Sequence, residues 1–318
     1  MRSGRFPRLL LMGTTLEHAG HEALFAEQRP RLFGLAYRLT GSAEDAEDAV
    51  QEAFLRLLEG GTALAPDQRA FWLVRVTTNL ALDALRRRKR RSYSGPWLPS
   101  PLASAGELEQ AADARYDRLE SATLAFLLAL EALGPRQRAV LLLRDVVGMP
   151  AREVARVLEL SEANVRVIHT RARRAMESYD RRRCVPTPEL ERRHRAALEG
   201  FLAALLAQDV AAVEAWLAED ARTVTDAAGE YTALASELVG RARVARLYLQ
   251  ATRTRQTSEP HMELRVLNGL PTLVTRLGSP VRRQAPLSVL SLELDGDGRI
   301  ARVLTVLAPR KLAALTRA

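Results

Sequence analysis

The chain has 318 residues, enough for two or three domains, and its 47% hydrophobic and 27% charged residues are typical of globular proteins. The single cysteine, Cys184, excludes a disulfide framework and any cysteine-based zinc site, and fits the reducing cytoplasm. No apolar run is close in length to the about 18 residues that a transmembrane helix needs, so we expect no contact with a membrane.

The net charge of +9 is unevenly distributed. Residues 86–91 form an unbroken basic run, and a second basic cluster lies between residues 166 and 183. Acidic residues gather between residues 44 and 52. This pattern predicts two contacts with a polyanion and one contact with a basic protein surface.

The first part of the chain predicts helices. Residues 1–21 are expected to be a loose leader, and residues 22–92 a helical domain. Apolar residues at helical spacing end at Gly41, and Ser42 is a capping residue for the next helix, which ends at Gly60-Gly61. A third helix opens at Pro66 and runs into the basic run.

A proline-rich stretch at 93–117 predicts a semi-rigid, extended linker. Helices are expected to resume near Leu119, continue to Leu133, and build a second helical domain over 118–180. Within it, we expect a helix over Ala151–Leu158, a tight turn, and a longer basic helix from Glu162 to about Tyr179. A second linker covers 181–188.

Residues 189–318 show a mixed pattern. Two helices are followed by segments rich in Val, Leu and Thr, and Asp295–Gly298 reads as a hairpin turn. We expect an α+β domain with a curved antiparallel sheet.

The pair of helices at 151–179 predicts a helix-turn-helix. With Val165, Ile168 and Ala172 buried, the opposite face offers guanidinium groups for guanine edges and phosphates. Its candidate DNA-binding residues are Ser161, Ala163, Arg166, Val167, Thr170, Arg171 and Arg174. The alternative is an arginine-rich, solvated helix in a plain bundle.

The helix before the basic run carries a polar stripe. Arg75, Asn79, Asp83 and Arg86 lie three or four residues apart, and Trp72 lies near the start. A polar stripe with an aromatic neighbour suits a nucleic-acid strand that is being unstacked. The alternative is a solvated amphipathic helix with Trp72 in its core.

An acidic face on the second helix is a candidate docking surface for a basic protein. Glu44, Asp48, Gln51, Glu52 and Glu59 face away from the apolar stripe of Val50 and Phe54, and Asp45 is a further candidate for the same contact. A solvated acidic face is the alternative.

Together these residues resemble a known family. Phe33–Arg38, Gly41–Arg56 and Phe71–Asp83 resemble region 2 of an extracytoplasmic-function (ECF) sigma factor, and Leu133–Arg174 resembles its region 4. Gly95–Pro101 resembles the linker motif of the subgroup with a C-terminal SnoaL-like domain, with Ser100 in place of the usual Glu. The resemblance implies two all-α domains followed by a cone-shaped, NTF2-like α+β domain.

The resemblance also implies roles. The acidic face would bind the β′ clamp of core RNA polymerase, with region 4 at the β flap. Trp72 and the Arg75–Arg86 stripe would read and melt the minus-10 element of promoter DNA, and the 162–174 helix would read the minus-35 element. Glu159 stands in the region 4 turn where the family often has Gly.

For regulation, the resemblance implies control by the chain's own C-terminal domain, without a separate anti-sigma factor. The candidate interdomain residues are Pro96, Trp97, Leu98, Pro99, Asp226 and Lys311. Asp226 and Lys311 stand in altered versions of two subgroup motifs, at 226–230 and 308–312. We expect Trp97 and its prolines to pack on the C-terminal domain, and a monomer when free.

Two other classes of function remain open at this point. One is a self-contained transcription factor whose C-terminal domain senses a ligand. The other is an enzyme, since SnoaL-like domains resemble cyclases and isomerases; Asp226 could be its base, although the sequence offers no partner. The leading interpretation has no catalytic residue, metal or cofactor.

Overall fold

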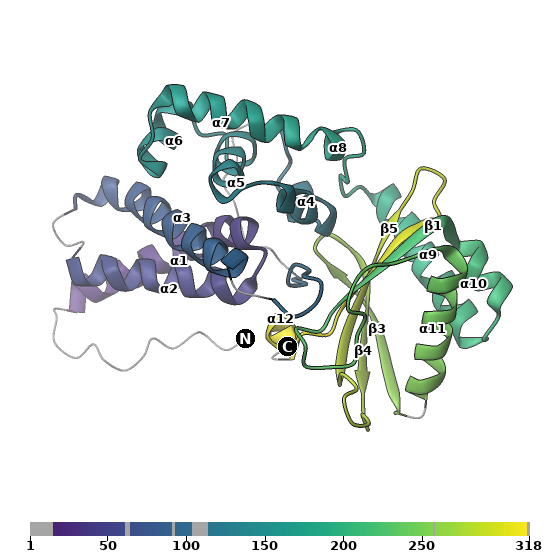
Figure 1. Cartoon of the computed structure of the whole chain (residues 1–318). Helices are drawn as coiled ribbons and strands as arrows, with labels where there is room; N and C mark the ends of the chain where they lie inside the picture. The colour runs from purple at the N-terminus through teal and green to yellow at the C-terminus, as the bar shows by residue number, and fades with distance from the viewer. Residues whose placement is uncertain (1–14, 61–63, 91–92, 104–113, 257, 317–318) are drawn as a thin grey trace.

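The structure is a computed structural model that describes residues 15–60, 64–90, 93–103, 114–256 and 258–316. Helices α1 to α8 lie on one side of the molecule and a sheet with further helices lies on the other (Figure 1). The two sides meet at the linker and at helix α12.

The first three helices match the predicted helical domain. They are α1 (Thr15–Thr40), α2 (Ala43–Gly60) and α3 (Pro66–Arg90). Gly41 ends α1 with a φ of 69°, and the Ser42 hydroxyl accepts a hydrogen bond from the amide of Asp45 at 3.2 Å. Because α1 begins at Thr15, residues 15–21 of the expected leader are helical; residues 1–14 of the leader and Arg91 of the basic run lie outside the described residues.

The second helical block is more broken than predicted. Its elements are η2 (Glu120–Ala122), α4 (Leu124–Ala129), η3 (Leu130–Ala132), α5 (Pro135–Leu141), the π-helix η4 (Leu142–Val146), α6 (Ala151–Leu158), α7 (Glu162–Ala175) and α8 (Glu177–Asp180). The helices expected from near Leu119 to Leu133 are three short elements, and Thr123 takes an extended backbone between the first two and caps α4.

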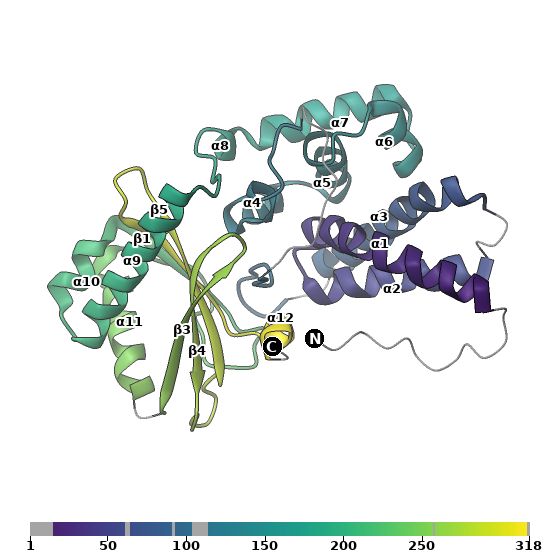
Figure 2. The same cartoon turned by 180° about the vertical axis from the view of Figure 1, so that it is seen from behind.

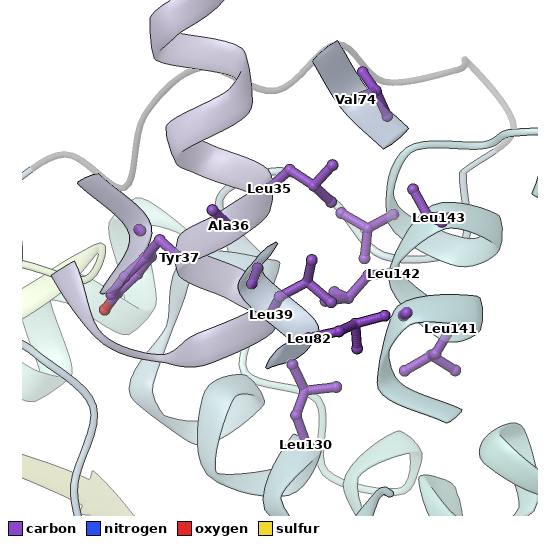
Figure 3. Close-up of a cluster of buried hydrophobic side chains, with 14 of the residues drawn as sticks. Leu35, Ala36, Tyr37, Leu39, Val74, Leu82, Leu130, Leu141, Leu142 and Leu143 are labelled. Carbon is purple, nitrogen blue, oxygen red and sulfur yellow. The ribbon is translucent and has the colours of Figure 1, made fainter. Parts of the chain in front are cut away.

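The two helical blocks share one core. Leu35, Leu39 and Leu82 of the first block pack with Leu141 and Leu142 of the second (Figure 3). The guanidinium of Arg138, only 1% exposed, donates to the carbonyl of Leu39 at 3.0 Å and so ties the blocks by a polar contact as well. Burial of this many leucines holds the blocks together through the hydrophobic effect.

The third domain contains the sheet. Its elements are α9 (Pro188–Leu206), α10 (Val210–Trp216), β1 (Leu217–Asp226), β2 (Leu238–Val239), α11 (Arg241–Gln256), β3 (Pro260–Leu267), β4 (Leu270–Leu277), β5 (Leu287–Leu294), β6 (Ile300–Val306) and α12 (Pro309–Thr316). The strand order is β2-β1-β6-β5-β4-β3. Helices α9, α10 and α11 cover one face (Figure 2).

The expectation of a wholly antiparallel sheet is wrong. β1 and β6 pair in parallel, from Leu217 beside Ile300 to Asp226 beside Val306. The chain leaves β1, passes through β2, α11 and three further strands of the sheet, and returns along β6 in the same direction. Helices α11 and α12 were not predicted.

The second face of the sheet receives the linker. Because successive residues of a strand point to opposite faces, Val303 joins the core under α9 to α11 while Leu304 joins the other. On that other face Leu98 of the linker and Leu312 of α12 are buried, with Leu128 of α4 packed against them. The sheet thus serves as a platform for the linker between the helical blocks.

Candidate nucleic-acid interface and interdomain site

Helices α6 and α7 form the predicted helix-turn-helix. Glu159 closes α6 in the left-handed region with a φ of 55°, which explains why glycine is favourable at this turn. The hydroxyl of Ser161 then accepts from the amide of Asn164 at 3.2 Å and caps α7. Val165 and Ala172 are fully buried, so the predicted inner stripe is confirmed.

The outer face of α7 is open to solvent. All seven candidate residues on it are exposed: Ser161, Ala163, Arg166, Val167, Thr170, Arg171 and Arg174. Arg166 pairs with Glu162 at 3.2 Å, whereas Arg171 and Arg174 form no ion pair within the described ranges. This face therefore presents free guanidinium groups to an approaching polyanion.

The polar stripe of α3 is partly engaged. Asn79 and Asp83 are exposed, and Arg86 is half-buried and pairs with Asp83 at 2.7 Å. Arg75 forms an ion pair with Glu159, in the turn of the helix-turn-helix. Trp72 is half-buried against the helical core, so part of its surface serves packing.

The acidic face of α2 is accessible. Asp48 and Gln51 are exposed, while Asp45 and Glu52 are half-buried. Partial burial, then repulsion from Asp45 and Glu47, raises the pKa of Asp48. A basic partner would relieve that repulsion.

Asp226 joins the linker to the third domain. Its carboxylate is fully buried and accepts from the Tyr93 hydroxyl at 2.6 Å, the Leu98 amide at 2.8 Å and the Lys311 ammonium at 2.5 Å. Lys311 also donates to the carbonyl of Leu98 at 2.5 Å. The sequence revealed no catalytic partner for Asp226, and in the structure its carboxylate is occupied by these contacts and is poorly suited to act as a base.

Trp97 lies between two cations. The guanidinium of Arg88 lies 3.7 Å from its ring centroid and the ammonium of Lys311 lies 4.3 Å away. A Cβ added at Gly41 would lie 2.4 Å from the indole, so the first domain leaves room for this ring. Trp97 therefore packs between the first and third domains, not on the third alone.

The prolines beside Trp97 are covered as well: Pro96 is half-buried and Pro99 is buried. Burial lowers the pKa of Lys311 to about 8, while the charge of Asp226 opposes that shift. Sequence reasoning missed Tyr93, Arg88 and Gly41, whose parts become evident only once the domains are packed.

Within the described residues, no three His, Cys, Asp or Glu side chains gather in a way that could hold a metal ion. None of the helices described is both long and apolar enough to cross a membrane.

Comparison with known proteins defines the class. Residues 24–91 match Sigma-70 region 2, and residues 123–176 match Sigma-70 region 4. The ECF RNA polymerase sigma factor SigJ of Mycobacterium tuberculosis is 35% identical over 227 residues, which is 71% of each chain. The chain therefore belongs to the ECF RNA polymerase sigma factors.

The crystal structure of M. tuberculosis SigJ extends the likeness to the third domain. It superimposes with a TM-score of 0.68 and 28% sequence identity, over 92% of this chain and 98% of that one. The protein is thus a promoter-recognising transcription initiation factor with a C-terminal SnoaL-like domain, as the sequence predicted. A solved sigma factor of Bartonella quintana, RpoE in complex with the anti-sigma factor NepR, aligns with 51% of this chain at 19% sequence identity and a TM-score of 0.39.

Proposed function

We propose that α7 reads the minus-35 element and the α3 stripe reads and helps to melt the minus-10 element, after the chain has joined core RNA polymerase. The observation that carries this proposal is the exposed arginine face of a capped helix-turn-helix, on which Arg171 and Arg174 form no ion pair within the described ranges. In the same proposal, Asp48 and Gln51 on α2 dock on the β′ clamp and the second helical block docks on the β flap.

The electrostatic part of DNA binding can be bounded. Neutralising about six phosphates gives a salt slope of roughly −5 in log K against log salt. This term is blind to sequence, so discrimination between promoters falls to the outer face of α7 and the stripe of α3.

The described arrangement is closed, and we propose that it is the resting state. The minus-35 and minus-10 elements are named for positions about 25 base pairs apart, and that separation is roughly 85 Å at about 3.4 Å per base pair. In the closed arrangement, Arg75 of α3 pairs with Glu159 beside α7, and both blocks share one core. The two helices cannot span the promoter until the blocks separate.

The C-terminal domain supports the closed arrangement in this proposal. It buries Leu98 of the linker, holds Asp226 against the same segment, and packs beside Leu128 of the second block. We also propose that the free chain is a monomer, works in the cytoplasm where core polymerase and chromosome meet, and needs no separate anti-sigma factor.

Two assays test the function. A pull-down with core polymerase and run-off transcription from a candidate promoter should give a stable complex and a promoter-dependent transcript. Neither would be seen if the proposal were wrong. Tight promoter binding without core polymerase would instead favour the self-contained transcription factor.

The closed arrangement is tested by Asp226→Asn, which weakens the pairing with Lys311. We expect more transcript than from the wild-type chain at the same concentration. Arg192→Ala, at an exposed residue of the same domain that pairs with Glu189 within α9, is the control. Equal transcription from D226N and R192A would contradict control by the C-terminal domain.

A further inference from the structure

The turn between β3 and β4 is buried at the meeting point of the domains. Asn268 and Gly269 form its tip, both with a positive φ, and Asn268 is only 3% exposed. Tips of two-residue hairpins normally face solvent, where Asn-Gly is favoured for its backbone alone. Here the asparagine side chain has partners in three other parts of the chain.

Each polar group of the Asn268 amide is satisfied by a different segment. Its Nδ2 donates to the Tyr37 hydroxyl of α1 at 2.8 Å and to the Ala122 carbonyl of the second block at 2.9 Å. Its Oδ1 accepts from the backbone amide of Leu102 in the linker at 3.2 Å, and the backbone amide of Asn268 donates to the Leu102 carbonyl at 2.7 Å.

Further contacts surround the hairpin tip, next to Tyr37 and next to Gly269. The Tyr37 hydroxyl donates to the Ser100 carbonyl at 2.6 Å, and the Ser100 amide donates to the Gly41 carbonyl at 2.9 Å. On the other flank, a Cβ at Gly269 would lie 3.2 Å from Pro186 in the second linker. One hairpin tip thus touches the first block, both linkers and the second block.

We infer that Asn268 is a positioning residue that latches the closed arrangement, separately from the Asp226 site. The two sites share no hydrogen-bond partner in the described part of the chain: Asp226 holds Tyr93, Leu98 and Lys311, whereas Asn268 holds Tyr37, Ala122 and Leu102. The regulatory meaning of the latch rests on the proposed control by the C-terminal domain.

The physical reason is the cost of unpaired polar groups. Tyr37 is fully buried. If the Asn268 side-chain amide is removed, the Tyr37 hydroxyl and the Ala122 carbonyl each lose the hydrogen-bond donor that it supplies. Separation of the domains lets water reach both groups, so removal of the amide penalises the closed arrangement more than the open one. The side chain therefore shifts the equilibrium between them, beyond its effect on local stability.

Asn268→Gly isolates the amide. Glycine tolerates the φ of 51° and keeps the hairpin turn, so only the side-chain contacts are lost. Arg283→Gly is the matched control, because Arg283 is an exposed residue of the same domain with a φ of 64°. The full chain is used throughout.

The readout is amide hydrogen exchange of a peptide spanning residues 96–103. Pro99 and Pro101 lack amides, so the reporters include Leu98, Ser100 and Leu102, which donate to Asp226, Gly41 and Asn268. We expect N268G to exchange roughly tenfold faster or more than the wild type, and R283G to match the wild type. Wild-type exchange at Leu98 and Ser100 in N268G would overturn the latch.

Two further measurements separate the alternatives. If N268G fails to fold by circular dichroism, Tyr37→Phe removes one partner of the amide, and unchanged exchange in Y37F would overturn the inference. Run-off transcription with core polymerase should rise in N268G. Faster exchange without more transcript would leave the latch intact and contradict the proposed control.

Discussion

At the scale of single residues, the buried pair of Lys311 and Asp226 determines how the third domain is attached. Both side chains are almost completely enclosed, and the ammonium also lies over Trp97. A buried ion pair gives little net stability over an apolar pair, but loss of one partner leaves an uncompensated charge. Substitution of either residue is therefore expected to lower the free energy of unfolding.

Lys311→Met keeps the aliphatic stem and leaves the Asp226 carboxylate without its cation. We expect the free energy of unfolding to fall by about 2–4 kcal/mol, because Tyr93 and Leu98 compensate only part of the charge. Urea unfolding followed by circular dichroism measures this. Arg310→Ala, whose side chain is 82% exposed, should change it by less than about 1 kcal/mol, and equal losses in the two variants would contradict the assignment.

His194 of α9 gives a prediction about pH. The side chain is buried, and desolvation lowers its pKa from 6.5 to about 4. The unfolded chain then binds more protons than the folded chain between these values, so stability is lost as the pH falls from about 6.5 towards 4. The limiting slope is about 1.4 kcal/mol per pH unit for one group.

Replacement of His194 by Gln removes this titration. Urea unfolding at pH 7, 6 and 5 should show a weaker pH dependence in H194Q than in the wild-type chain. The same dependence in both chains would mean that other groups cause the acid sensitivity.

At the scale of elements, α7 is a capped helix with one buried and one free face. Arg174→Ala should weaken promoter binding by the holoenzyme about equally on all sequences and reduce the salt slope by about 1, because Arg174 is exposed and unpaired in the described structure. Arg192→Ala on α9 is the control, since Arg192 is exposed and pairs with Glu189. A change of base preference in R174A would assign Arg174 to base readout instead.

Sequence patterns predicted elements with strong local signals and missed those without them. The stripe of Val165, Ile168 and Ala172 predicted α7, whereas the five arginines at 241, 243, 246, 253 and 255 obscured the apolar face of α11 around Val244 and Ala245. The parallel pairing of β1 and β6 depends on where a distant strand returns, which no local pattern records.

The residues of the candidate sites also divide into those that the sequence could predict and those that it could not. The open face of α7 and the acidic face of α2 follow from helical periodicity, and Trp97, Asp226 and Lys311 were identified through a family resemblance. Arg88 and Asn268 escaped notice because their contacts cross between domains. An Asn-Gly pair predicts a turn, and its burial becomes visible only in the folded molecule.

At the scale of the whole molecule, the two helical blocks behave as one body in the closed arrangement. Arg88 of α3 bridges them, donating to Glu131 at 2.6 Å and to the Thr40 carbonyl at 2.7 Å. Partner binding can open such a contact only through a higher affinity for the open arrangement. Core polymerase and promoter DNA together would supply this difference in affinity between the open and closed arrangements.

The most direct test is the distance between the blocks with and without these partners. Spin labels at Leu55 on α2 and Glu177 on α8, both exposed, can be introduced with Cys184 replaced by serine. Pulsed electron paramagnetic resonance should give one short distance for the free chain and a much longer one in the complex with core polymerase and promoter DNA. An unchanged distance in a complex that makes transcript would contradict the account.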